Sequence, residues 1–375
     1  MKKTLLATAI AGALGVTAAA QAATVYDQDG TKIDIYGRIT MGIAGGGPEY
    51  TSSGAYQDNG AEFADAYSRL GLRLQHMVSS DLTAFGHLEW RFAADEAGRN
   101  GASNFDAFSE TRQAYLGLRS DSWGTIQAGN FDSFYNQSVS APFDVYIDRG
   151  LEFGSHRTHS RGDSIGYITP NLNGFQVYLQ AKHYSERGES RGAERDEEIV
   201  AQGGVKYEVG GLRLAAGFID DKYVGSDVVD LELQPDGTLD PVYSTTNDSG
   251  GNDEVRYGAT VAYQFTPEFS ARLGYEGRDN NSTHGGGFDT WGLGMTYAVN
   301  QWTLHADLYH VDEDDASDER LAWAAGAYYN ISSNFDVFLE LNQEDQPDIS
   351  AGSGGFSTDG DDGDMYYLIG ARYHF

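Results

Sequence analysis

Strand-length segments of this chain place apolar side chains on one face and polar or charged side chains on the other. The last of them, residues 365–375, has an apolar or aromatic side chain at every second position and ends on Phe375. Alternation with a period of two predicts a β-strand whose two faces meet different surroundings. Because no residue follows to cover this apolar face, neighbouring strands or lipid must bury it.

The same alternation recurs in residues 33–41, 69–75, 82–92 and 291–297, and charged side chains such as Glu89 occupy one face even in mid-strand. In a soluble β-sandwich the two sheets pack face to face, whereas a transmembrane barrel turns its apolar face toward lipid. We therefore predict that the apolar face contacts lipid and that the charged face meets water.

The first residues have the pattern of a secretory signal peptide. Lys2 and Lys3 precede an apolar stretch over residues 5–20, and Ala20-Gln21-Ala22 has the small residues of a cleavage site. We expect residues 1–22 to be removed on export and residues 23–375 to form a single domain.

The composition excludes several classes of protein. After the signal segment there is no run of about 18 apolar residues, so no transmembrane helix is predicted. The chain has no cysteine, so an exported form does not depend on disulfides. A formal net charge of −31 at pH 7 repels nucleic-acid phosphates and favours cations.

Two kinds of connection alternate along the chain. Short connections made of turn residues fall at 79–81, 121–122, 171–173, 210–211, 266–268, 300 and 332–334. Long polar loops are expected at 44–62, 95–108, 132–161, 186–197, 222–253, 280–287, 312–319 and 346–364. Six of the seven prolines fall within these turns and loops, and Pro170 directly precedes the turn at 171–173. The 16 segments between the breaks predict an all-β fold, a 16-stranded antiparallel transmembrane β-barrel.

Four segments and the chain end resemble the general diffusion porins of the Gram-negative outer membrane. The segments run from Val25 to Arg38, Tyr67 to Gly71, Thr111 to Ala114 and Leu151 to Gly154. The resemblance implies a homotrimer of 16-stranded barrels, each with its third long loop folded inward, through which small hydrophilic solutes and ions diffuse. It implies no enzyme activity and no cofactor. The expected partners are lipopolysaccharide, outer-membrane lipid and the barrel-assembly machinery, with no nucleic acid.

The same resemblance assigns residues to the pore. Four arginines match the basic cluster on the family's barrel wall: Arg38, Arg69, Arg112 and Arg161. Asp148 and Glu152 match the acidic pair on the inward loop. The chain end matches the family's assembly signal at Leu368, Gly370, Tyr373 and Phe375.

The chain departs from the family pattern at three places. Leu151 stands where the family has proline, Ser155 stands where it has glycine, and Gly129-Asn130-Phe131 replaces a Gly-Arg-Asn-Tyr segment. Because of the third difference, one further arginine of the family's barrel wall is not matched in this segment.

Arginines on one wall and carboxylates on the other predict an electric field across the pore. The six matched residues carry more positive than negative charge, but Asp132, Asp144, Asp163 and the acidic mouth loops shift the balance. We therefore expect a preference for cations. His156 and His159 lie on the same loop and gain charge near about pH 6.5, so acid is expected to weaken this preference.

An enzyme is one alternative to a channel. Glu152, His156 and His159 have the spacing of metal ligands on a helix, and Ser155 and Ser160 accompany the histidines as in a hydrolase. No hydrolase or zinc-protease motif surrounds them, so we expect no catalytic residue and no metal site.

Two further alternatives concern ligands of a channel. Acidic runs at 312–319 and 359–364 suit calcium in composition but lack EF-hand spacing. A solute-specific channel would carry a row of aromatic rings along its lumen, for which Tyr36, Phe85 and Tyr178 are scattered candidates.

Overall fold

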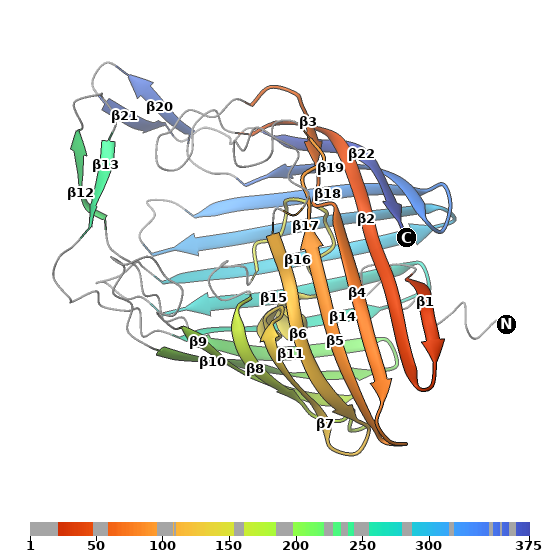
Figure 1. Ribbon diagram of the computed structural model, residues 1–375. Helices are drawn as coiled ribbons and strands as arrows, with labels where there is room; N and C mark the ends of the chain where they lie inside the picture. Colours follow the sequence, from red (N-terminus) through yellow and green to blue (C-terminus); the bar gives the residue numbers. More distant parts are fainter. Residues whose placement is uncertain are drawn as a thin grey trace.

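The structure is a computed structural model that describes residues 22–47, 59–95, 108, 110–153, 161–184, 198–220, 228–233, 239–243, 255–279, 287–314, 319–344, 348–352, 355–359 and 365–375. Within this part of the chain, one sheet closes into a barrel of sixteen antiparallel strands (Figure 1). In order around the barrel these are β2 (Thr31–Gly46), β4 (Arg69–Met77), β5 (Leu82–Arg91), β6 (Glu110–Ser120), β7 (Gly124–Asn130), β8 (Asp163–Ile168), β9 (Phe175–Tyr184), β10 (Glu198–Val209), β11 (Leu212–Asp220), β14 (Val255–Gln264), β15 (Phe269–Arg278), β16 (Phe288–Val299), β17 (Trp302–Glu313), β18 (Arg320–Asn330), β19 (Phe335–Gln343) and β22 (Tyr366–His374).

The first and last barrel strands pair to close the sheet. The register between β2 and β22 runs from Arg38 opposite His374 to Gly46 opposite Tyr366. The main chains of Gly37 and Phe375 also exchange two hydrogen bonds, of 2.9 and 3.1 Å. Closure leaves no barrel-strand edge unpaired in the membrane, and it confirms the predicted fold class.

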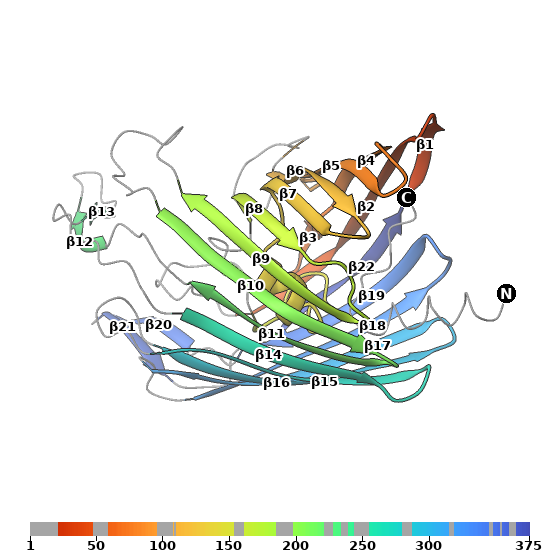
Figure 2. The same ribbon diagram turned by 90° about the horizontal axis from the view of Figure 1, so that it is seen from below.

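The two ends of the barrel differ as the sequence predicts. All seven predicted short turns connect consecutive strands, and Figure 2 shows these tight connections gathered at one end. The long connections lie at the opposite end. Asn173 and Asn300, each within one of these turns, adopt a positive φ of 57° and 54°, which asparagine accepts more readily than most residues.

The first segment that resembles the family contains two strands. The segment from Val25 to Arg38 is a hairpin rather than one strand, because β1 (Ala23–Gln28) folds back on β2 through Asp29 and Gly30. Both turn residues have positive φ, 51° and 74°, as a tight Asp-Gly hairpin turn requires. The short β3 (Glu62–Asp65) pairs with the far end of β2, next to β4.

Two predicted long loops also contain strands. The loop at 222–253 includes a hairpin of β12 (Val228–Leu233) and β13 (Leu239–Tyr243), and the loop at 346–364 includes β20 (Asp348–Gly352) and β21 (Gly355–Asp359). Pro241 therefore lies in a strand, contrary to expectation. In a two-stranded ribbon both strands have a free edge, where a missing N–H is tolerated.

The barrel wall has an apolar outside and a polar inside. Leu293 and Met295 on β16 are 53% and 48% exposed, whereas Thr290 and Thr296 on the same strand are buried. On β22, Ile369 is 51% exposed and Leu368 is fully buried, so the apolar face predicted for residues 365–375 points outward. In water such a surface is unfavourable, and lipid removes that cost. Among the described residues, no helix is long and apolar enough to cross a membrane.

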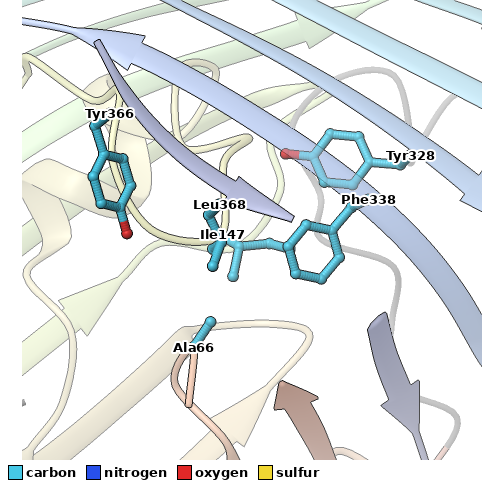
Figure 3. Packing of buried hydrophobic residues seen from close by; sticks show 6 residues of the cluster. All are labelled: Ala66, Ile147, Tyr328, Phe338, Tyr366 and Leu368. Carbon is cyan, nitrogen blue, oxygen red and sulfur yellow. The ribbon is translucent and has the colours of Figure 1, made fainter. Parts of the chain in front are cut away.

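The segment between β7 and β8 folds back inside the barrel (Figure 2). Residues 131–153 include a short π-helix, η1 (Asn136–Ser140), and pack on inward side chains of β9, β10, β11, β14, β15, β18 and β19. At its far end Ile147 packs with Tyr328, Phe338 and Leu368 of the wall, as Figure 3 shows. This inward loop narrows the lumen.

Candidate pore constriction

The four predicted wall arginines come together on one side of the lumen. Arg38 and Arg69 project inward from the paired strands β2 and β4, Arg112 projects inward from β6 on the far side of β5, and Arg161 lies just before β8. Arg38 is within electrostatic range of Arg69 and Arg112. Side chains at alternate positions share the lumen face, which explains why separate strands bring these residues to one level.

Carboxylates from the same wall hold most of these arginines. Glu89 on β5 accepts a hydrogen bond from Arg112 and lies 3.6 Å from Arg69. Asp132 lies 3.5 Å from Arg112 Nη2 and 3.0 Å from Arg161 Nε. The basic wall is therefore a network of ion pairs whose carboxylates offset much of its positive charge.

Three members of this network are not among the pore residues predicted from the sequence: Glu89, Arg91 and Glu110. Arg91 pairs with Glu110 at 3.1 Å, and Glu110 also binds Arg161. The alternation of β5 does place Glu89 and Arg91 on the lumen face. That signal finds the face, but only the pairing of β5 with β4 and β6 identifies the partners.

Arg38 is held differently, by a strained turn between β3 and β4. Its Nε donates a 3.2 Å hydrogen bond to the carbonyl of Tyr67, and no carboxylate of the described residues lies within 4 Å of it. Tyr67 has a φ of 64°, which is uncommon for an aromatic residue, and Arg91 lies 4.4 Å above its ring. The turn thus orients two arginines at once.

The opposite side of the constriction is formed by the inward loop. Arg213 on β11 donates hydrogen bonds to the carbonyls of Gln137 and Ser138, at 3.1 and 2.8 Å. Tyr135 donates to Glu276 of β15 at 2.7 Å, and burial raises the pKa of its phenol well above the usual value, which keeps it a donor. These bonds fix the first part of the loop to the wall.

Glu340 of β19 fixes the far end of the loop. Its carboxylate accepts hydrogen bonds from the main-chain N–H groups of Ile147 and Asp148, at 2.6 and 3.2 Å, and from the hydroxyl of Tyr328. Because Glu340 is only 3% exposed, three donors compensate a carboxylate that would otherwise be costly to bury. The acidic residues of the loop are thereby held against β18, β19 and β22.

The two predicted acidic residues both have wall partners. Asp148 accepts a 2.5 Å hydrogen bond from Tyr366, and Glu152 forms a 2.8 Å ion pair with Arg320 of β18. Arg149 lies 4.0 Å above the ring of Tyr366. The sequence analysis did not anticipate Arg149 or Arg320 at this edge.

Asp144 is the loop carboxylate that faces the arginines most openly. Its side chain is exposed, and within the described residues it makes no hydrogen bond or ion pair. Arg112, Arg69 and Arg38 are its main positive neighbours. The arginine wall therefore faces a loop carboxylate that has no hydrogen-bond or ion-pair partner among the described residues.

The enzyme and calcium alternatives find no support in the described residues. His156, His159, Ser155 and Ser160 lie outside them, and Glu152 is already occupied by Arg320. No group of three or more potential metal ligands comes together in the described part.

The aromatic candidates for a solute-specific channel do not form an open row. Tyr36 and Tyr178 are only 3% and 7% exposed, and Tyr178 packs beneath the loop against Phe134. Phe85 alone of the three is partly exposed.

A closed barrel with an apolar exterior, a polar interior and a folded loop across its lumen defines a channel of the outer membrane. A family profile described as Gram-negative porin matches residues 7–349. The chain therefore belongs to the Gram-negative porin family.

Two relatives illustrate the range of this similarity. A monosaccharide porin of a Halomonas species is 28% identical over 387 residues, covering 100% of this chain and 91% of that protein. Outer membrane porin F of Escherichia coli K12 is 28% identical over 229 residues, covering 58% of this chain and 59% of that protein.

Solved structures share the fold. An anion-selective porin from Comamonas acidovorans has a TM-score of 0.68 at 18% identity, covering 92% of this chain and 100% of that chain. OmpF of Salmonella typhi, in complex with daunomycin, has a TM-score of 0.66 at 18% identity, covering 94% of this chain and 100% of that chain. These likenesses concern the barrel rather than the residues in its lumen.

Proposed function

We propose that this outer-membrane porin is a water-filled channel for passive diffusion of small hydrophilic solutes and ions, with a preference for cations. The observation that carries the preference is the exposed, unpaired carboxylate of Asp144 opposite an arginine wall already paired with Glu89, Glu110 and Asp132. Passing cations meet a free negative charge, while most of the positive charge is compensated.

The net charge of the chain supports the same preference. A formal charge of −31 raises the local concentration of cations at the pore mouths, and the effect is largest at low ionic strength. Asp148 and Glu152 add negative charge at the loop edge, partly offset by Arg149 and Arg320. His156 and His159 are proposed to reduce the preference in acid.

Replacing Asp144 by asparagine tests the cation preference. Reversal potentials in a dilute KCl gradient should shift toward anions, because the variant loses a loop carboxylate that has no partner among the described residues. Asp81→Asn removes a charge from the short turn between β4 and β5 and should leave the potential unchanged. Equal potentials for Asp144→Asn and wild type would contradict the proposed role.

Passive diffusion is tested with neutral sugars of increasing size. Liposomes containing the protein should swell at rates that fall smoothly with solute size and rise linearly with concentration. A swelling rate that saturates as the concentration of one monosaccharide rises, but not with other sugars of the same size, would favour a solute-specific channel instead.

Assembly is proposed by similarity. A solved OmpT of Vibrio cholerae, with a TM-score of 0.65, is described in a trimer form, and we propose a homotrimer for this chain as well. Lipopolysaccharide, outer-membrane lipid and the barrel-assembly machinery are the proposed envelope partners, with residues 1–22 as the export signal. Crosslinking of the folded protein should give a trimer band, and a monomer alone would contradict this.

A further inference from the structure

A second group of arginines lies on the same wall, between the constriction and the short-turn end of the barrel. Arg73 on β4 stands opposite His87 of β5, and Arg119 on β6 stands opposite Thr83. Phe85 lies on β5 midway between His87 and Thr83, and therefore between the two arginines along the strand direction. All these side chains belong to the lumen face, since the intervening Leu116 and Leu118 of β6 are exposed on the outside.

These two arginines differ from Arg69, Arg112 and Arg161 of the constriction in lacking acidic partners. Neither has a carboxylate within 4 Å or a hydrogen bond among the described residues. Asp34, the residue paired with Arg73 across β2 and β4, is held instead by Lys32 at 2.9 Å and Thr24 at 2.6 Å. Both guanidinium groups therefore keep donors available for a ligand.

Aromatic rings form the floor of this surface. Tyr36 lies across Gly71 and Phe85 lies across Gly117, so closely that a side chain on either glycine would collide with the ring. Arg73 lies 4.2 Å above the ring of Tyr36, and Arg119 lies 5.9 Å from that of Phe85. Arg73 covers the buried ring of Tyr36, whereas the ring of Phe85 remains partly exposed.

Neighbouring side chains hold the rings in place. Tyr115 packs edge-on against Phe85, with 6.2 Å between centroids, and hydrogen-bonds His87 at 2.8 Å. His87 also binds Tyr36, which donates to Glu89 at 2.7 Å. Phe85 and Tyr115 remain partly exposed to the lumen, so the surface is preformed and open.

We propose that Arg73, Arg119, Phe85 and Tyr115 form a binding site for small organic anions that carry a flat apolar ring. The carboxylate would be bound by the two guanidinium groups, and the ring would stack on Phe85 and meet Tyr115 edge to face, because the planes of these two rings are 81° apart. The constriction disfavours anions, and such a site would retain the organic anions that have already passed through it. This proposal rests on the proposed open channel, which it extends to a class of solute.

The test measures binding of benzoate to the folded, detergent-solubilised barrel by titration calorimetry. Benzoate should bind saturably, whereas acetate, which lacks the ring, and benzyl alcohol, which lacks the charge, should bind at least about tenfold more weakly. Arg73→Gln with Arg119→Gln should weaken benzoate binding by about tenfold or more. Phe85→Leu should weaken benzoate binding but leave acetate binding unchanged.

Lys206→Gln is the matched control, because Lys206 is a charged side chain on β10, close to Tyr178, that already has a carboxylate partner, Glu208 at 3.0 Å. It should bind benzoate as wild type does. Equal benzoate affinity in wild type and the double arginine variant would overturn the site, as would equal affinity for benzoate and acetate.

Conductance in planar bilayers separates the two proposals. Normal conductance without arginine-dependent benzoate binding would refute the site and leave the channel function intact. Arginine-dependent binding by a barrel that carries no current would support the site and refute the channel function.

Discussion

At the residue scale, the charges of the constriction act mainly as pairs. Glu152 lies 2.8 Å from Arg320, with both side chains mostly buried, so changing one partner alters the charge of the other's surroundings. An arginine left without its carboxylate contributes its full positive charge to the lumen. Selectivity is thus determined by which pairs are complete, rather than by a count of charged residues.

A pair of variants tests this view. Glu152→Gln should reduce cation preference by more than Glu152→Gln combined with Arg320→Gln, because only the single variant leaves Arg320 charged without its nearer carboxylate, with Glu313 at 3.7 Å as the remaining partner. Reversal potentials in dilute KCl measure both. If the double variant shifts the potential as far as the single one, Arg320 has no influence on permeating ions.

At the scale of elements, the inward loop is held by side chains from the wall, with Arg213 at η1 and Glu340 at residues 147 and 148. Each anchor pairs main-chain groups of the loop that would otherwise be buried without partners. Loosening an anchor should therefore change the motion of the loop before it changes the barrel.

Arg213→Lys tests the anchor at η1. Lysine keeps the charge but has a single nitrogen in place of the planar guanidinium that binds the carbonyls of Gln137 and Ser138. We expect larger fluctuations of the open-channel current with little change in mean selectivity. An unchanged noise spectrum would show that the remaining bonds suffice to hold the loop.

The terminal strand is the second element with a testable role. Phe375 exchanges main-chain hydrogen bonds with Gly37, and its ring lies directly against that glycine. Deleting Phe375 removes both bonds at the closing seam, together with the last residue of the assembly signal proposed at Leu368, Gly370, Tyr373 and Phe375.

We expect the deletion to reduce the amount of folded protein in the outer membrane. Heat-modifiable, protease-resistant protein can be compared between the deletion and Phe375→Tyr, which retains a ring and the main-chain bonds. Undiminished folded protein in the deletion strain would argue against a role for this residue in assembly.

At the scale of the whole molecule, the barrel inverts the usual arrangement of side chains. Exposed leucines and aromatic residues face lipid, while the interior carries ion pairs, some of them at the lumen and others, such as Arg272 with Asp307, buried. Long-range attraction of cations by the total charge is screened by salt, whereas contact pairs in the lumen are screened less.

Cation preference should accordingly fall as ionic strength rises. The screening length shortens from about 30 Å at 0.01 M salt to about 3 Å at 1 M. The remaining preference at high salt should disappear in Asp144→Asn, because it comes from the constriction itself. A preference that is independent of salt would exclude a contribution from the acidic mouths.

The sequence by itself determined the faces, the turns and the number of barrel strands. A period of two assigns Arg38, Arg69 and Glu89 to the lumen and Ile369 to lipid, because successive side chains of a strand point in opposite directions. The glycine, asparagine, serine and proline positions marked the short turns, because these residues accept turn conformations.

Tertiary structure alone decided which charges meet. Glu152 and Arg320 are 168 positions apart, and Asp148 and Tyr366 are 218 positions apart. Periodicity states that a side chain points inward but not where around the barrel it stands, and the path of the loop across the lumen sets its contacts. That Asp144, Arg73 and Arg119 have no ion-pair partner in the described part of the chain follows from that path and from strand register, neither of which local pattern encodes.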